Sequence, residues 1–176
     1  VRHQFTFDEM FSATVGAGLD ADGNGKLTRE ELVALAKENV ESLHEYGYFT
    51  VVKIEDQEGV LTEPVDYYSE GDAKGIVSLH FTLPFAAPVK LGSLQLSLTV
   101  LDPTNFIAFG FAAKDPIVMA ANAPKSCTPS VEKPEVDPAL QQLDDAFAGA
   151  SGGVVAGNAD PSIQWPAQKA FLKCGA

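Results

Sequence analysis

Two stretches of apolar residues at helical spacing open the chain, and a short polar segment separates them. Between residues 7 and 19, and again between 32 and 43, apolar side chains recur every three to four positions, which predicts two amphipathic helices. Residues 6–9, TFDE, have the spacing of a capping box, so we expect the first helix to begin there. The two stripes consist of Phe7, Met10, Phe11, Thr14, Val15, Gly18 and Leu19, and of Leu32, Leu35, Ala36, Val40 and Leu43.

From residue 47 onward the apolar period changes from helical to alternating. Residues 76–83 and 94–100 alternate apolar and polar side chains, which is typical of antiparallel strands with one buried face. On this pattern His80 lies on a polar, solvated face. The other predicted strands are 48–54, 65–69, 105–112, 128–133 and 169–174, and a short helix is predicted from Pro138 to about Ala148.

Short strands separated by Gly, Pro, Asp and Asn turn signals predict a β-sandwich. We therefore expect an α+β fold in which an EF-hand helix-loop-helix, residues 1–46, packs on an antiparallel β-sandwich. The sandwich would comprise residues 47–176, with a short C-terminal helix and a terminus tethered by a disulfide. The two parts would form one structural unit.

The polar segment between the predicted helices, DADGNGKLTREE at 20–31, follows the twelve-residue template of an EF-hand calcium loop. Calcium is a hard cation that takes six to eight oxygen ligands, so such a loop turns alternate residues toward one centre. Gly25 stands at position six, where the loop turns sharply. The alternative is an acidic surface turn, which DG and NG dipeptides often mark. The predicted ligands are Asp20, Asp22, Asn24, Thr28 and Glu31 through their side chains, and Lys26 through its backbone carbonyl.

This oxygen ligand set predicts Ca²⁺ as the bound ion, accepts lanthanides, and suits nickel, cobalt or zinc poorly. Calcium sensors commonly carry paired loops that meet at position eight, whereas this sequence holds a single such loop. The residue at position eight, Leu27, therefore needs another partner. We expect it to pack on the β-domain, and dimerisation through two loops is the alternative.

Composition and charge narrow the possible functions. The 176 residues are 45% hydrophobic, which is typical of a globular chain, and no run is long enough to cross a membrane. A formal charge of −12 disfavours nucleic acid and anionic membranes as partners and is compatible with cation binding. The histidines, His3, His44 and His80, stand in no catalytic or zinc-binding motif. We therefore expect no enzymatic activity.

The two cysteines, Cys127 and Cys174, can form only one intramolecular disulfide. We predict that they are bonded, because the bridge would fix the C-terminal segment and stabilise the fold. A disulfide would place the protein in an oxidising compartment. The alternative is a pair of free thiols in a cytosolic protein.

Several runs resemble a family of bacterial periplasmic proteins of unknown function: RHQFTFDEMFSA, LDADGNGKLTREEL, EYGYFTVVKI, LHFTLPF and LDPTNFIAF. That family is catalogued as the periplasmic component of an uncharacterised ABC-type transport system, and its members often sit beside nickel/cobalt-type transporters. The resemblance implies a periplasmic protein. No signal peptide is visible and the sequence begins at Val1, so we expect a processed or truncated chain from which any targeting segment has been removed. The resemblance also implies an earlier strand with a His-Pro-His start, which this sequence lacks, so no metal site is carried over from there.

Two functional hypotheses follow. In the first, a single EF-hand holds a structural calcium ion in an accessory module of metal transport or homeostasis, with a membrane metal transporter as the partner implied by the resemblance. In the second, the protein is a periplasmic carrier or sensor of a lanthanide or transition metal for a transporter. The oxygen-rich ligand set favours the first.

Overall fold

The structure is a computed structural model that describes residues 1–90, 92, 94–104, 106–132 and 167–175. The chain divides into two compact units. Unit 1 comprises Val1–Tyr48 and Val60–Pro88, and unit 2 comprises Phe49–Gly59 and Val89–Ala176. Each unit contains an antiparallel sheet, and both described α-helices belong to unit 1, so the predicted α+β class is confirmed. The helix predicted at 138–148 lies outside the described residues.

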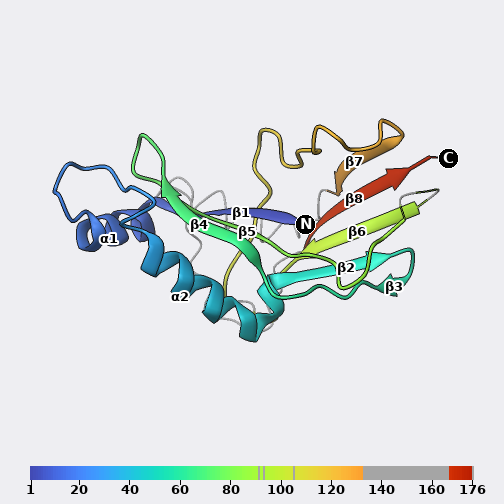
Figure 1. Ribbon diagram of the computed structural model, residues 1–176, viewed down its shortest axis with the longest axis horizontal. Coiled ribbons are helices and arrows are strands. Elements are labelled where there is room, and N and C mark those ends of the chain that lie inside the picture. Colours follow the sequence, from blue (N-terminus) through green and yellow to red (C-terminus); the bar gives the residue numbers. More distant parts are fainter. Residues whose placement is uncertain (91, 93, 105, 133–166, 176) are drawn as a thin grey trace, which may run out of the picture. The chain divides into compact units, whose positions relative to one another are not determined.

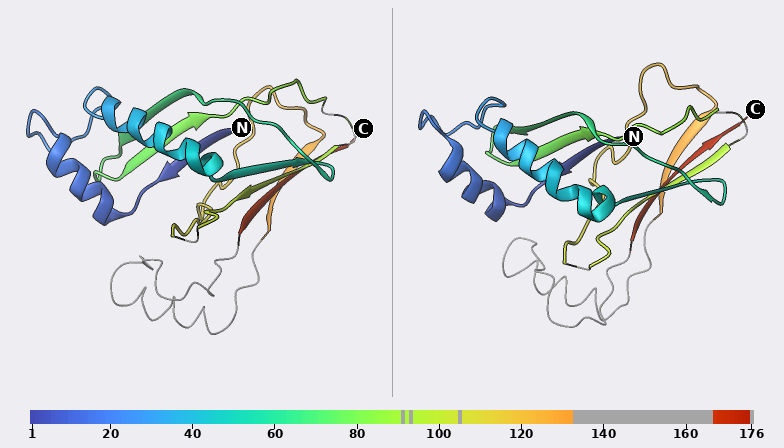
Figure 2. Two further views of the ribbon diagram at one scale, coloured as in Figure 1. Left: turned by 90° about the horizontal axis from the view of Figure 1, so that it is seen from below. Right: turned by 60° about the horizontal axis from the view of Figure 1, so that its bottom comes forward.

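Unit 1 is a three-stranded antiparallel sheet that packs against two helices, with the strand order β1-β5-β4 (Figure 1). The central strand is therefore β5, and β4 is an edge strand. The views in Figure 2 show α2 running along the sheet. The elements are β1 (Arg2–Thr6), α1 (Glu9–Leu19), α2 (Val33–Leu43), β4 (Val65–Gly71) and β5 (Val77–Thr82), with a 3-10 helix, η1 (His44–Phe49), after α2.

The predicted start of the first helix at Thr6 is wrong. Thr6 is the last residue of β1, which pairs with β5 up to the partner Ser78. The N-cap of α1 is Asp8, whose Oδ1 accepts the N–H of Phe11 at 2.8 Å. Pairing with β5 holds residues 2–6 in an extended conformation, so the chain turns into the helix two residues later than the capping-box pattern indicates.

The main core of unit 1 forms where α2 packs on β5. Ala36 and Val40 of α2 contact the buried Leu79 and Phe81 of the strand. The stripe predicted for α1 is wrong at Met10, whose side chain is 74% exposed. Ser12 is buried instead, and its Oγ accepts the backbone N–H of Val77 at 3.0 Å. This bond gives the first N–H of β5 a partner and fixes the side of α1 that faces the sheet.

The expectation that one face of β5 is solvated is also wrong. All residues from Val77 to Phe81 are buried, including Ser78 and His80. A central strand has neighbours on both edges, and here the side chains of those neighbours cover the polar face as well. The ring of Tyr68 on β4 stacks on that of His80, with centroids 4.6 Å apart.

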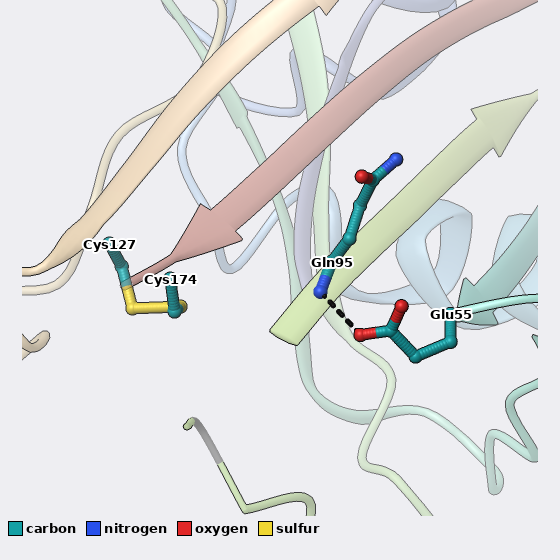
Figure 3. Close-up of a disulfide and its surroundings, with 4 residues drawn as sticks. All are labelled: Glu55, Gln95, Cys127 and Cys174. Carbon is teal, nitrogen blue, oxygen red and sulfur yellow. Dashed lines mark hydrogen bonds between the residues drawn. A yellow bond between two sulfur atoms is a disulfide. The ribbon is translucent and has the colours of Figure 1, made fainter. Parts of the chain in front are cut away.

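Unit 2 contains a five-stranded antiparallel sheet with the strand order β3-β2-β6-β8-β7. The strands predicted near residues 48–54, 94–100, 128–133 and 169–174 are present, and β3 was not predicted. In the turn after β2, Glu55 Oε1 accepts the N–H of Gln95 at 2.9 Å (Figure 3). The strands are β2 (Thr50–Ile54), β3 (Gln57–Glu58), β6 (Leu94–Val100), β7 (Cys127–Glu132) and β8 (Gln168–Cys174).

The strand predicted at 105–112 is not formed by residues 106–112. The buried carboxylate of Asp102 accepts the backbone N–H groups of Thr104, Phe106 and Ile107 at 2.7–2.9 Å. Burial alone would raise the pKa of Asp102, but the bonds from Thr104, Ile107 and Phe106 outweigh it and lower that pKa. The carboxylate thus takes the N–H groups that a strand would have used for pairing.

The predicted disulfide between Cys127 and Cys174 is present, with an S–S distance of 2.08 Å (Figure 3). The two residues lie directly opposite each other on β7 and β8, and both are buried. The bridge therefore joins the first residue of β7 to the last residue of β8. None of the helices in the described part of the chain has the length and apolar character needed to cross a bilayer.

The disulfide makes a measurable contribution to stability. A Cys127→Ala/Cys174→Ala variant should lose about 4 kcal/mol of unfolding free energy on the chain-entropy model, because the bridge closes a loop with a sequence separation of 47 residues. Urea denaturation with and without reductant tests this, with the double variant insensitive to reductant as the control. Alkylation of the denatured, unreduced protein should add no label in mass spectrometry, and two labelled thiols would contradict the bridge.

His3 should make unit 1 sensitive to mild acid. Burial, and secondarily the positive N-terminus, lower its pKa from 6.5 to about 4. Between these values the unfolded chain binds a proton that the folded chain does not, so stability falls as the pH drops from 6.5 toward 4. The loss should approach about 3 kcal/mol.

Denaturant unfolding of the wild type and of His3→Gln over this pH range gives, for each protein, the slope of the unfolding free energy against pH. The variant should show a smaller slope that is not zero, because burial also lowers the pKa of His80. Equal slopes for the two proteins would show that His3 is not the titrating group.

Candidate metal centre

The acidic loop, Asp20–Glu31, joins α1 to α2, and hydrogen bonds within the loop hold its first half. Asp20 accepts the N–H of Asn24 at Oδ1, 3.1 Å, and that of Gly25 at Oδ2, 2.8 Å. Gly25 has a φ of 76°, in the left-handed region that favours glycine. The sharp turn that position six of the template requires is therefore formed.

Asn24 connects the first and middle parts of the acidic loop. Its backbone N–H also donates to Oδ1 of Asp22 at 3.0 Å, and its Nδ2 donates to Oδ2 of Asp22 at 2.6 Å. Its Oδ1 accepts the N–H of Lys26 at 2.7 Å. Lys26 thus belongs to the bonded loop through its N–H, while ligation through its carbonyl stays a prediction.

The second half of the acidic loop contains a capping box formed by Thr28 and Glu31. Oε2 of Glu31 accepts the N–H and the hydroxyl of Thr28, each at 2.9 Å, and the Glu31 N–H donates to the Thr28 hydroxyl at 3.3 Å. Oε1 of Glu31 reaches back to the N–H of Ala21 at 2.9 Å. These bonds from Thr28, and then that from Ala21, lower the pKa of Glu31, so the carboxylate stays ionised at neutral pH.

Three carboxylates meet at the centre of the acidic loop. Asp20, Asp22 and Glu31 each offer an oxygen, and these oxygens all lie within 4.8 Å of one another. Like charges at this distance repel, and the N–H donors of the loop offset only part of that repulsion. A hard divalent cation fits this set by charge and by ligand type, because calcium prefers carboxylate and carbonyl oxygens. The predicted ligands Asn24 and Thr28 belong to the same hydrogen-bonded loop.

The acidic loop rests on the sheet of unit 1 through Leu27. This side chain is 9% exposed and forms a buried cluster with Leu32 and Val77. Gly71 of β4 lies directly beside it: a Cβ on Gly71 would lie 3.0 Å from the Leu27 Cβ. The apolar side chain at position eight therefore packs against the adjoining ends of β4 and β5.

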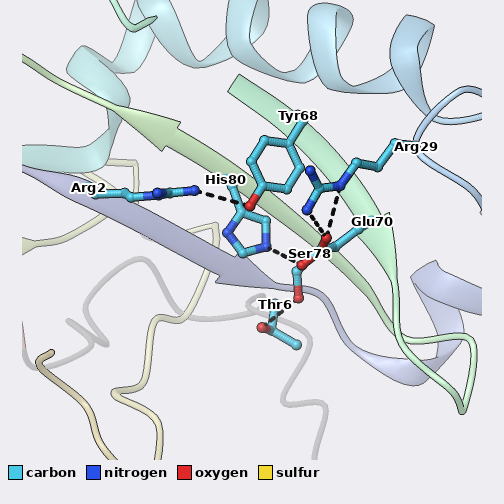
Figure 4. Close-up of polar contacts among 7 residues, drawn as sticks. All are labelled: Arg2, Thr6, Arg29, Tyr68, Glu70, Ser78 and His80. Atoms are coloured by element: carbon cyan, nitrogen blue, oxygen red, sulfur yellow. Dashed lines mark hydrogen bonds and ion pairs between the residues drawn. The ribbon is translucent and has the colours of Figure 1, made fainter. Parts of the chain in front are cut away.

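A second contact between the acidic loop and the sheet is not indicated by the sequence. Arg29, which is not a predicted ligand, forms an ion pair with Glu70 of β4 (Figure 4). The two residues are 41 positions apart, and their meeting depends on how β4 lies against the loop. No local motif could have indicated it.

The fold and the site define an α+β protein with a helix–loop–helix element whose loop gathers three carboxylates. The chain belongs to the family described as Protein of unknown function (DUF1007), which it matches over residues 1–165. Comparison with curated proteins and with solved structures found no match.

The contact between Leu27 and Gly71 can be tested by adding one methyl group. In Gly71→Ala the new Cβ would lie 3.0 Å from the Leu27 Cβ and 3.2 Å from its carbonyl oxygen. Such overpacking should lower the unfolding free energy by about 1–3 kcal/mol in urea denaturation.

Gly18→Ala is the matched control, because a Cβ there meets nothing within 4 Å. Since Gly18 lies within α1, alanine should leave stability unchanged or raise it by about 0.5–1 kcal/mol. If Gly71→Ala were as stable as the wild type, Leu27 would not be seated at that position.

Proposed function

We propose that the acidic loop is an EF-hand that binds one calcium ion, and that the ion has a structural role. The observation that carries this proposal is the convergence of Asp20, Asp22 and Glu31 within 4.8 Å, in a loop that follows the twelve-residue template. The capping box at Thr28 and the left-handed Gly25 support the same ligand arrangement.

A structural role is favoured over a switch by the packing of the loop. A calcium switch opens a groove, typically rich in methionine, in which a target binds. Here Leu27 and Leu32 are already packed with Val77, and the methionine of the helix pair, Met10, is on the surface. The ion would lock this arrangement and order the loop.

We further propose that the protein works outside the cytoplasm, in the periplasm, as an accessory module of metal transport or homeostasis. The disulfide between Cys127 and Cys174 supports an oxidising compartment. Calcium is abundant outside the cytoplasm, so a lone loop there does not need sensor affinity. The oxygen ligands would also accept a lanthanide, whereas zinc and nickel should bind weakly.

Calorimetric titration of the metal-free protein with calcium, a lanthanide, zinc and nickel tests the site. We expect a calcium Kd of about 10⁻⁶ to 10⁻⁴ M. Glu31→Gln should weaken calcium binding most, because it removes one charge and the bidentate ligand. Glu30→Gln is the matched control: it removes the neighbouring charge, which is not a predicted ligand, and should change the Kd little. Equal losses in both variants would argue against a specific site.

Calcium should raise the melting temperature by mass action, since it would bind only the folded loop. A hydrophobic dye should show constant or lower emission when calcium is added, because no apolar surface is exposed. Brighter emission would identify a sensor and overturn the structural role.

A further inference from the structure

The guanidinium of Arg29 binds two residues of β4. Its Nε donates to Oε2 of Glu70 at 3.1 Å, and its Nη2 donates to the same oxygen. Its Cζ lies 3.8 Å from the centroid of the Tyr68 ring, within the range of a cation–π interaction. Arg29 stands at position ten of the acidic loop, between the predicted ligands Thr28 and Glu31.

To make these contacts, Arg29 passes the outer edge of the sheet. Leu27 lies on the face that carries the helices, against Gly71 and Val77. Side chains alternate along a strand, so Tyr68 and Glu70 lie on the opposite face. Because β4 is an edge strand, the side chain of Arg29 reaches round that edge. The loop therefore holds β4 on both faces, by Leu27 on one and by Arg29 on the other.

The residues that receive Arg29 are themselves fixed. Tyr68 lies between the guanidinium and the buried ring of His80, which stacks on it at an interplanar angle of 11° (Figure 4). The Tyr68 hydroxyl accepts a bond from Arg2 at 3.1 Å. Oε1 of Glu70 lies 3.2 Å from Nε2 of His80, although the orientation gives no hydrogen bond. The bond from Arg29 lowers the pKa of Glu70, so its carboxylate is ionised.

Resting on the calcium site proposed above, we propose that Arg29 is a positioning residue for that site. Glu70 and Tyr68 hold its side chain, and the held side chain keeps the turn from Thr28 to Glu31 in the conformation that presents both ligands. The β4–β5 hairpin thereby holds this single loop in place, as the second loop does in a paired EF-hand.

Two physical effects make calcium affinity depend on this clamp, by which we mean the side chain of Arg29 held by Glu70 and Tyr68. Fixing the backbone before the ion arrives reduces the conformational entropy that the loop loses on binding. The negative charge of Glu70 also offsets the positive charge of Arg29, which would otherwise repel a divalent cation bound by the neighbouring residues. Glu70 contributes to both effects, whereas loss of Arg29 removes the clamp and the repelling charge together.

The test compares the calcium Kd of the full chain with those of Arg29→Gln, Glu70→Gln and the double variant, by calorimetry. Among these three variants, Glu70→Gln should weaken binding most, by about tenfold or more, because it frees the loop and leaves an unpaired cation beside the ion. Arg29→Gln should weaken it less, and the double variant should resemble Arg29→Gln. Arg29→Lys keeps the charge but loses the planar fork, and should recover part of the affinity.

Lys37→Gln is the matched control. It removes a cation and an exposed ion pair with Glu41 within α2, away from the acidic loop, and should leave the Kd unchanged. The melting temperature without calcium shows separately whether the contact of Arg29 with β4 contributes only to stability. If Arg29→Gln and Glu70→Gln lowered that temperature while binding calcium as tightly as the wild type, the positioning role would be wrong.

Failure of this inference and failure of the proposed function give different results. A wild type that binds calcium, with unchanged affinity in both single variants, overturns the role of Arg29 and leaves the calcium site standing. A wild type that binds no calcium overturns both. If Glu70→Gln binds calcium more weakly than the double variant, as predicted, the result supports both the calcium site and the positioning role of Arg29.

Discussion

The burial of Leu27 against Gly71 and Val77 is the contact on which the seating of the acidic loop depends. The ion pair of Arg29 with Glu70 is exposed, and such a pair contributes little to the free energy of unfolding in water. An apolar side chain at position eight, by contrast, loses its hydration when it packs on the sheet and gains on the order of 2 kcal/mol. Gly71 leaves room for this packing, because a Cβ there would lie 3.0 Å from the Cβ of Leu27 and crowd it.

What the sequence could predict is mainly local structure. The bonds within the acidic loop join residues two to ten positions apart, so a twelve-residue template contains nearly all the information that shapes it. The alternation that marked β5 and β6 located both strands for the same reason, because a period of two is a local signal, although it did not give the burial of β5. The disulfide was predictable because only two cysteines exist.

What the sequence could not predict depends on which strands meet. The pairing of β1 with β5 converts an apparent helix start at Thr6 into the end of a strand. His80 is buried because Tyr68 happens to lie opposite it, a matter of register between strands. Residues 106–112 are a run of apolar residues and glycine typical of a buried strand, yet Asp102 takes the N–H groups of Phe106 and Ile107 that would have paired. In the first two cases a contact made by tertiary structure outweighed a local preference, and in the third a buried side chain a few residues away did so.

The same distinction explains how a single loop could serve as a calcium site. Its ligands are specified locally, but three carboxylates held together without help from outside would repel one another and keep the loop mobile. The sheet supplies the missing constraint through two contacts of different kinds, an apolar one at Leu27 and a charged one at Arg29. Because the two contacts lie on opposite faces of one edge strand, the loop cannot lift from the sheet without breaking both. On the proposed function, calcium then completes the ordering of a loop that the sheet already holds, and most of the binding energy goes into stabilising unit 1 rather than into rearranging it.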